Sequence, residues 1–185
     1  MTLLARLRGG TDAAHRALED DLAFLSRLGS PQRYEDLLGA FLGFHEPLDK
    51  ALAAATAAQG LPWTPLADAD RLAWDLQRFG WSPARIAALP RCSPPDVETL
   101  PALIGSLYVV EGARLGGQLI TRWIADSLGP VPVSFFAGDG DARRRFRRFG
   151  AVAEAALSAE QVPDAVEAAN RHFLLVRDWL AEAGL

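Results

Sequence analysis

Three histidines are the residues of this chain best suited to hold a metal, and they stand far apart in the sequence. His15 is followed four residues later by Glu19, so a helix brings both side chains to one face. A carboxylate at that position accepts a hydrogen bond from Nδ1 and orients the imidazole, which leaves Nε2 to bind a metal. His15 is therefore a candidate metal ligand, with a satisfied core position on an apolar helical stripe as the alternative.

The remaining chemistry-bearing residues support fewer kinds of site. His45 and His172 lie in apolar helical contexts where a core or boundary position suffices, and neither is expected to be a ligand. A di-iron carboxylate site needs histidines and carboxylates from several helices, and no histidine lies between these two. Cys92 falls in a proline-rich segment that does not place it as a nucleophile. The sequence therefore disfavours both a di-iron carboxylate enzyme and an enzyme that uses a cysteine nucleophile.

One segment, GSLYVVEGARLGGQLITRWI, combines a helical pattern with several glycines. A glycine inside a helix costs about 0.5–1 kcal/mol relative to alanine. Gly105, Gly112 and Gly116 fall within an arc of roughly 40° on a helix, and Gly117 widens the bare face. Such a face suits a flat ligand or another helix, and spacing alone does not decide between them. The glycines also permit a bend.

Helical periodicity dominates the chain, and strand-like alternation is scarce. Thr11 or Asp12 is expected to cap the first helix, and Pro47 to kink or divide the second. A loop containing Phe135 and Phe136 is expected over 129–140. The predicted helices cover about 11–28, 31–58, 68–79, 83–89, 96–128, 141–157 and 159–183.

Composition fits one soluble all-α domain over 1–185, because half of the residues are hydrophobic and five are tryptophan. A net charge of −4 argues against a general nucleic-acid binder. The uncharged stretch near the middle of the chain, Leu100 to Val110, is too short to span a bilayer. Arg6 and Arg8 interrupt any signal-like start, and the lone Cys92 favours a reducing compartment, so a cytoplasmic protein without a membrane partner is expected.

These segments together resemble the heme oxygenases, especially the bacterial type found alongside bacteriophytochromes. Thr11, His15, Leu18 and Glu19 resemble the family's proximal helix, and the stretch from Leu107 to Gln118 resembles its distal helix. FLGFHEPLDKAL and HFLLVRDWL also look like that family, so the resemblance spans nearly the whole chain in order. It implies a heme oxygenase-like helical bundle with heme between the first helix and the glycine-rich helix.

The resemblance also implies an activity. Heme b would be both cofactor and substrate, and oxygen with electrons from an external donor would open it to biliverdin, carbon monoxide and ferrous iron. A ferredoxin or its reductase is the expected electron donor, and a bacteriophytochrome is one candidate acceptor of the bilin.

Site residues follow from the same resemblance. His15 would be the axial iron ligand and Glu19 its orienting partner. Gly112, Gly116 and Gly117 would lie against the other heme face, where Gly112 and Gly116 leave room for bound oxygen and so serve catalysis.

Arginines are expected to bind the heme propionates. Arg8 and Arg147 match the family's basic contacts, and Arg147 belongs to a run with Arg143, Arg144, Arg145 and Arg148. Such a run also fits a solvated basic face, or a docking face for an acidic electron donor. Phe173 is assigned either to the pocket wall or to the core.

Ala113 departs from the family pattern, because several members carry an aspartate there that organises distal water. Arg114 and Glu111 are nearby candidates for a proton relay, and solvent-facing positions are the alternative for both. The departure keeps a second interpretation open, in which the protein is a heme carrier or sensor that does not turn heme over.

Overall fold

The computed structural model describes residues 1–27 and 29–185, with only the backbone described at 24, 26 and 27. The predicted all-α class is confirmed, since the described residues contain helices and no strand. The helices described are α1 (Leu3–Asp21), η1 (Leu22–Arg27), α2 (Pro31–Ala58), α3 (Asp68–Arg78), α4 (Pro83–Ala87), α5 (Leu100–Ala113), η2 (Arg114–Gly116), α6 (Gly117–Leu128), α7 (Ser134–Ala137), α8 (Ala142–Ala156), η3 (Ala159–Gln161) and α9 (Val162–Glu182), where η marks a short 3-10 segment.

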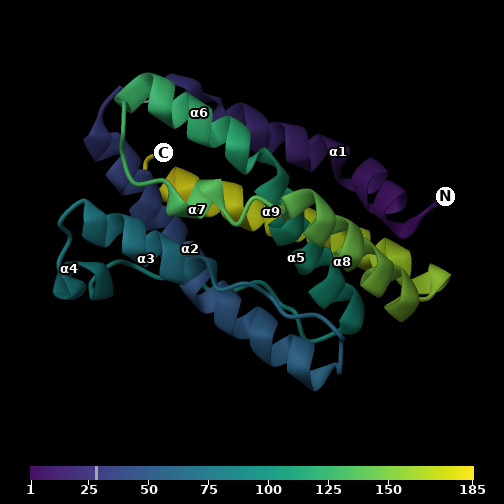
Figure 1. Ribbon diagram of the computed structural model, residues 1–185. Coiled ribbons are helices and arrows are strands. Elements are labelled where there is room, and N and C mark those ends of the chain that lie inside the picture. The colour runs from purple at the N-terminus through teal and green to yellow at the C-terminus, as the bar shows by residue number, and fades with distance from the viewer. Residues whose placement is uncertain (28) are drawn as a thin grey trace.

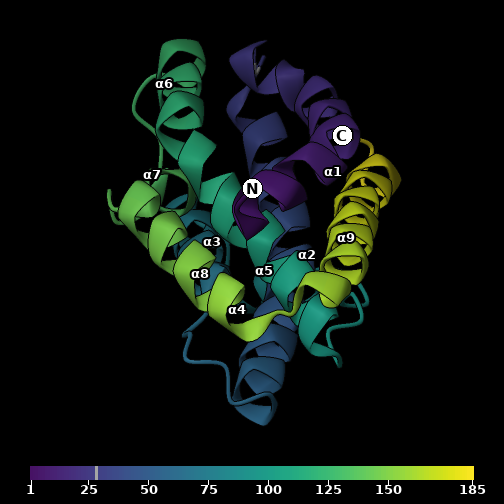
Figure 2. The ribbon, with the colours of Figure 1, turned by 90° about the vertical axis from the view of Figure 1, so that its right-hand side faces the viewer.

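α5 and α9 pack closely against each other within the bundle (Figures 1 and 2). The approach is tight because a Cβ on Gly105 of α5 would lie 2.4 Å from the carbonyl oxygen of Ala165 on α9. α1 packs along α9 and runs in the same direction, with Gly10 against Val166. α2 and α3 pack together in the lower half of Figure 1.

α1 begins eight residues earlier than predicted, at Leu3 rather than Thr11. Thr2 caps it, since the Thr2 hydroxyl accepts from the backbone N–H of Ala5, and Leu3 and Leu7 bury its first turns. Thr11 is inside the helix and its hydroxyl donates to the carbonyl of Leu7, so neither Thr11 nor Asp12 is the N-cap. The expected end at Leu28 lies outside the described residues, but α1 itself ends at Asp21.

α2 begins at Pro31 after the Ser30 cap, as predicted, and continues through Pro47 without being divided. Proline lacks the N–H that would bond the carbonyl four residues earlier, which here belongs to Gly43. That carbonyl instead accepts the N–H of Cys92 at 3.0 Å. The 90–92 connection therefore supplies the missing donor and docks against α2.

The glycine-rich helix differs most from its prediction. It starts at Leu100 behind the Thr99 cap rather than at Asp96, and it is not continuous. The 3-10 segment Arg114–Gly116 separates α5 from α6, and the chain changes direction there (Figure 1). The bend that the glycines permit is thus present.

The segment expected to be a loop contains the short helix α7. Its N-terminus is capped from a distance: the buried carboxylate of Asp75 on α3 accepts the N–H groups of Ser134 and Phe135, both at 3.0 Å. A carboxylate suits the positive end of a helix. Because the cap comes from another helix, the residues around 134–137 alone did not predict α7.

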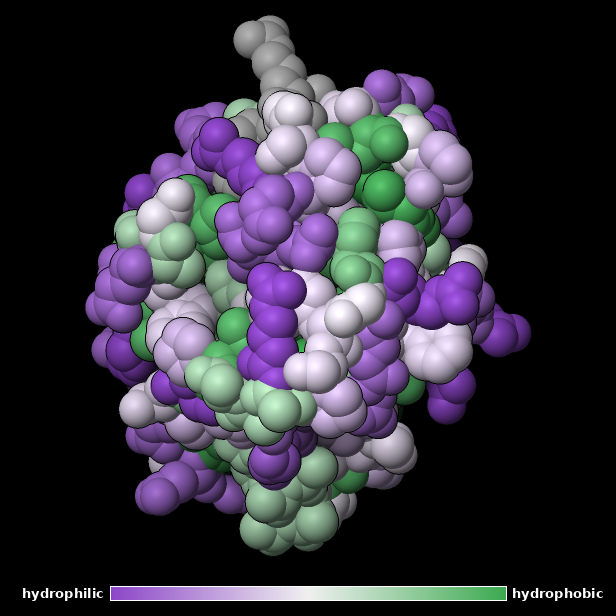
Figure 3. All heavy atoms as spheres, turned by 90° about the vertical axis from the view of Figure 1, so that its left-hand side faces the viewer, coloured by the Kyte–Doolittle hydropathy of each residue, from purple (hydrophilic) through white to green (hydrophobic). Residues whose placement is uncertain are grey.

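Among the described residues, no helix is both long and apolar enough to cross a bilayer. On the face shown in Figure 3, hydrophobic residues form small groups interrupted by hydrophilic ones.

Candidate functional site

His15 projects from α1 with about half of its side chain (51%) exposed, which excludes the core alternative. Its Nδ1 lies 3.4 Å from Oε2 of Glu19, one turn further along. The ring also meets Phe173 of α9 edge-on, with 5.6 Å between centroids. No hydrogen bond to Nε2 is found among the described residues. The imidazole is held on its Nδ1 side and open on the other, which is what an axial metal ligand requires.

A small hydrophobic cluster connects the His15 helix to the glycine segment. It is separate from the main core and consists of Val109, Ala169 and Phe173, with Ala14, Leu18 and Tyr108 packed against it. Ala14 and Leu18 flank His15 on α1, while Tyr108 and Val109 lie one turn before Gly112 on α5. Phe173 is buried and touches His15, so the two interpretations of this residue merge: it packs in the cluster and also lies against the candidate ligand.

Two glycines of the segment are explained by packing. A Cβ on Gly105 would clash with α9, as described above, and a Cβ on Gly117 would lie 2.1 Å from the carbonyl oxygen of Phe136 on α7. The helix-contact interpretation therefore holds for both positions. The Cα–Cβ direction at Gly117 points towards α7, so packing against α7 accounts for this glycine, and its contact with heme stays a prediction.

Gly112 and Gly116 are different. A Cβ on Gly112 would make only an ordinary contact, 3.7 Å from Phe146, and a Cβ on Gly116 would meet nothing within 4 Å. The backbone does not demand glycine at position 116 either, since its φ of −81° and ψ of −14° suit any residue. Gly116 thus borders open space beside the bend. Neither packing nor backbone geometry explains why this residue is a glycine.

An exposed apolar pair next to Gly116 was missed in the sequence. Leu115 and Leu119 stand one helical turn apart and are 45% and 49% exposed. Their four-residue spacing was a readable signal of a shared face. Exposed leucines beside an open glycine suit an apolar ligand better than bare solvent.

Arg8 and Arg147 come to neighbouring positions although 139 residues separate them in the sequence. α1 and α8 run antiparallel: Leu3 donates its N–H to Glu154, and Leu4 fills the place of a side chain on Gly150. One turn further along α1 is Arg8, and about one turn back along α8 is Arg147. Both are exposed and form no ion pair with a described residue.

The other arginines of the α8 run have divergent roles. Arg145 turns inward, where its guanidinium binds the carboxylate of Glu111 and lies 4.4 Å over the ring of Trp63. Arg144 pairs with Asp141 at the start of its own helix. Arg143 and Arg148 are exposed. Arg145 therefore has a structural role, whereas Arg143, Arg147 and Arg148 are exposed at the surface.

The two residues considered for a proton relay belong to a buried ionic network behind the bend. Glu111 is 1% exposed and accepts from Arg145 and from the indole N–H of Trp63. Arg114 donates two hydrogen bonds to Asp68 on α3, so it anchors the bend to another helix. The solvent-facing alternative is wrong for both, and each already has a fixed ionic partner.

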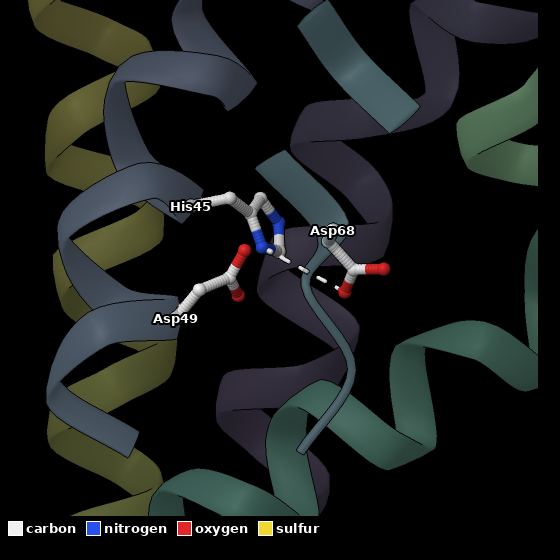
Figure 4. A group of neighbouring side chains, drawn as sticks. All are labelled: His45, Asp49 and Asp68. Atoms are coloured by element: carbon white, nitrogen blue, oxygen red, sulfur yellow. Dashed lines mark ion pairs between the residues drawn. The ribbon is translucent and has the colours of Figure 1, made fainter. Parts of the chain in front are cut away.

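His45, Asp49 and Asp68 form a cluster that the sequence analysis missed (Figure 4). Their side chains point towards one another from α2 and α3, and Nδ1 of His45 lies 3.9 Å from Oδ2 of Asp68. His45 Nδ1 and Asp49 Oδ1 are both buried without a hydrogen-bond partner among the described residues. The i,i+4 spacing of His45 and Asp49 was visible in the sequence, but the approach of Asp68 was not.

Burial controls the protonation of this region. Burial raises the pKa of Asp49 to about 7, against the opposing hydrogen bond from the N–H of Ala69. Burial also lowers the pKa of His45 to about 3, with help from the Arg114 charge. The pKa of His172 is about 3 for the same main reason, so its core position is confirmed and both imidazoles are neutral at pH 7.

We expect the stability of the wild type, measured relative to Asp49→Asn, to fall as pH rises from about 4 to about 7. The unfolded carboxyl ionises near 3.8, whereas the folded one keeps its proton to about 7. The stabilisation present at low pH is therefore lost as pH rises through the folded pKa. His45 and His172 act in the opposite direction, but they do so in both proteins.

Urea denaturation across pH 4–8, with a chelator present, isolates the contribution of Asp49. A difference in unfolding free energy between the two proteins that does not change with pH would show that this carboxyl titrates normally.

The chain matches one protein family over almost its entire length. The family model described as heme oxygenase matches residues 1–182. No curated protein matches the sequence.

Solved bacterial heme oxygenases share the fold. The enzyme of Neisseria meningitidis, with NO or CO bound, is 22% identical with a TM-score of 0.80, and the match covers 100% of this chain and 94% of that one. The enzyme of Leptospira interrogans is 21% identical with a TM-score of 0.78, over 98% and 100% of the two chains. Heme oxygenase-1 of the cyanobacterium Synechocystis, in complex with heme, is 18% identical with a TM-score of 0.76, over 98% and 92%.

Proposed function

Because the chain belongs to the heme oxygenase family, we propose that it binds heme b through His15 and opens it to biliverdin, carbon monoxide and ferrous iron. One observation carries the proposal: an exposed imidazole with a free Nε2 is connected by the Phe173 cluster to a glycine segment whose Gly116 borders open space. Heme, when bound, supplies both the iron that activates oxygen and the macrocycle that is oxidised.

The proximal side needs a neutral nitrogen ligand. Glu19, whose Oε2 lies 3.4 Å from Nδ1 of His15, would orient the imidazole, and Phe173 borders the ring edge-on from the α9 side. A neutral imidazole pushes less electron density onto iron than a thiolate, which suits oxygenation of the macrocycle better than O–O cleavage.

The distal side needs room and a fixed backbone. Gly112 and Gly116 leave the room, because neither carries a side chain beside the bend. Packing of Gly117 on α7 and the ion pair from Arg114 to Asp68 hold the bend in place. Leu115 and Leu119 add apolar surface next to it. Exclusion of water and close backbone approach are thus the contributions of this chain.

Arg8 and Arg147 are the proposed partners of the heme propionates, since both are exposed on the packed helices α1 and α8 and form no ion pair with a described residue. The exposed arginines of α8, Arg143 and Arg148 among them, also offer a basic face to an acidic electron donor such as a ferredoxin. A bacteriophytochrome remains the proposed bilin acceptor, and the lone Cys92 supports a cytoplasmic location.

We expect Arg8→Glu and Arg147→Glu each to weaken hemin binding roughly tenfold or more, because an ionic hydrogen bond contributes about 1.5–3 kcal/mol. Loss of one propionate contact also lets heme rotate in its plane, which presents another meso carbon to oxygen. Hemin titration and chromatography of the biliverdin isomers measure both effects.

Arg78→Glu on α3 is the matched control, since it makes the same charge change away from α1 and α8. Unchanged affinity and unchanged isomers in both test variants would move the propionate site elsewhere on the molecule.

A heme carrier or sensor is the second candidate, favoured by Ala113 at the position where several family members have aspartate. Aerobic incubation of the hemin complex with a reductant separates the two functions. We expect the Soret band to decay as a biliverdin band grows, with less than one protein molecule damaged per heme converted. A Soret band that persists under reductant and oxygen would support the carrier instead.

A further inference from the structure

We propose that His45, Asp49 and Asp68 form a binding site for one divalent transition-metal ion, separate from the candidate heme ligand His15. The three side chains come from α2 and from the first residue of α3, and Figure 4 shows them converging on one point. The site stands independently of the proposed heme chemistry.

Distances between the donor atoms suit a small cation. One ligand atom from each residue lies within 4.8 Å of the others, and the His45 Nδ1 to Asp68 Oδ2 distance is 3.9 Å. Two donors about 2.1 Å from a tetrahedral metal stand about 3.4 Å apart. The His45–Asp68 pair therefore has to contract by about half an ångström, and the most widely separated pair by at most about 1.4 Å, which side-chain rotation supplies.

Two of the donors are otherwise unexplained. Nδ1 of His45 and Oδ1 of Asp49 are buried and have no hydrogen-bond partner among the described residues. A buried polar atom without a partner is costly and calls for a bound group. Asp49 already uses Oδ2 to accept the N–H of Ala69, which fixes the carboxylate and directs Oδ1 into the cluster.

The ion pairs around the cluster leave one carboxylate without a cationic partner. The buried network contains three carboxylates but only two guanidinium groups that pair with them: Asp49, Asp68 and Glu111 against Arg114 and Arg145. Arg114 engages Asp68, and Arg145 engages Glu111. Asp49 is the carboxylate left without an ionic partner, and it is buried beside the neutral imidazole of His45.

The donor set indicates the class of metal. One imidazole nitrogen with two carboxylate oxygens suits Zn²⁺, Fe²⁺, Co²⁺ or Mn²⁺, whereas Mg²⁺ and Ca²⁺ prefer oxygen alone. Asp68 has lone pairs for a metal as well as for Arg114, since each carboxylate oxygen accepts more than one bond. A metal there would strengthen the anchoring of α3 to α2 behind the bend.

Co²⁺ is the probe, followed by calorimetry and by its d–d absorption. All proteins are full-length, chelator-treated and free of heme, and they carry His15→Ala, because His15 and Glu19 form an exposed histidine–carboxylate pair that binds metal adventitiously. We expect one Co²⁺ per chain. Asp49→Asn, which keeps the acceptor for Ala69 but loses the charge, should weaken binding at least ~10-fold, the least that loss of even an outer partner costs.

Glu46→Gln on the same helix is the matched control, since that partly buried carboxylate pairs with Lys50 and Arg91 instead. It should leave Co²⁺ binding unchanged. Absence of Co²⁺ binding in the His15→Ala protein, or equal binding by Asp49→Asn, would overturn the site and indicate a bridging water or proton. Thermal melting with and without Co²⁺ tests the same point without relying on the variant, because bound metal must raise the midpoint.

Discussion

His15→Ala is expected to abolish the histidine–heme absorption spectrum and to lower heme turnover at least ~100-fold, the cost of misplacing the reacting centre. The proximal ligand both binds iron and sets where the macrocycle sits. Far-UV circular dichroism should stay nearly unchanged, because the side chain is half exposed and His15 is not among the buried residues of α1.

Two further variants make this result specific. Replacement of His172, which is buried against Phe44, should leave iron coordination unchanged. Glu19→Gln should keep heme bound but alter the iron–histidine bond, because the partner of Nδ1 changes from anion to amide. A wild-type spectrum and rate in His15→Ala would show that another residue holds the iron.

Gly116→Ala is expected to impair heme oxidation without destabilising the apoprotein. Nothing lies within 4 Å of the new Cβ, and the backbone angles at this position suit any residue, so the fold accepts alanine. The methyl group enters the open space beside the bend, where we propose that bound oxygen sits. Gly116→Leu should exaggerate the loss and weaken heme binding.

Gly105→Ala is the matched control from the same glycine segment. Its Cβ must displace the backbone of α9, and overpacking of this kind typically costs about 1–3 kcal/mol. Apoprotein melting and turnover per folded molecule are measured on both variants. A destabilised Gly116→Ala protein with normal turnover would assign this glycine to packing.

Local signals in the sequence predicted local structure. Ser30–Pro31 and Ser82–Pro83 start helices where expected, because a cap followed by a first-turn proline acts within a few residues. Gly9 and Gly10, in contrast, concealed the first turns of α1, although Gly10 packs closely against Val166 of α9.

Features that depend on distant partners were not predictable from one sequence. α7 is capped by Asp75, about 60 residues away in the sequence. The cluster of His45, Asp49 and Asp68 forms only because Asp68 of α3 lies against α2. Spacing placed Gly105 and Gly116 on one helix face, but the 3-10 break and the approach of α9 give them different surroundings. The ion pairs of Glu111 with Arg145 and of Arg114 with Asp68 likewise join residues far apart in the sequence.

A crystal structure of the hemin complex tests the central claim most directly. The account predicts iron bonded to Nε2 of His15, Gly116 on the opposite heme face, and propionates directed to Arg8 and Arg147. Iron bonded to any other side chain, or heme bound away from Gly116, would contradict it.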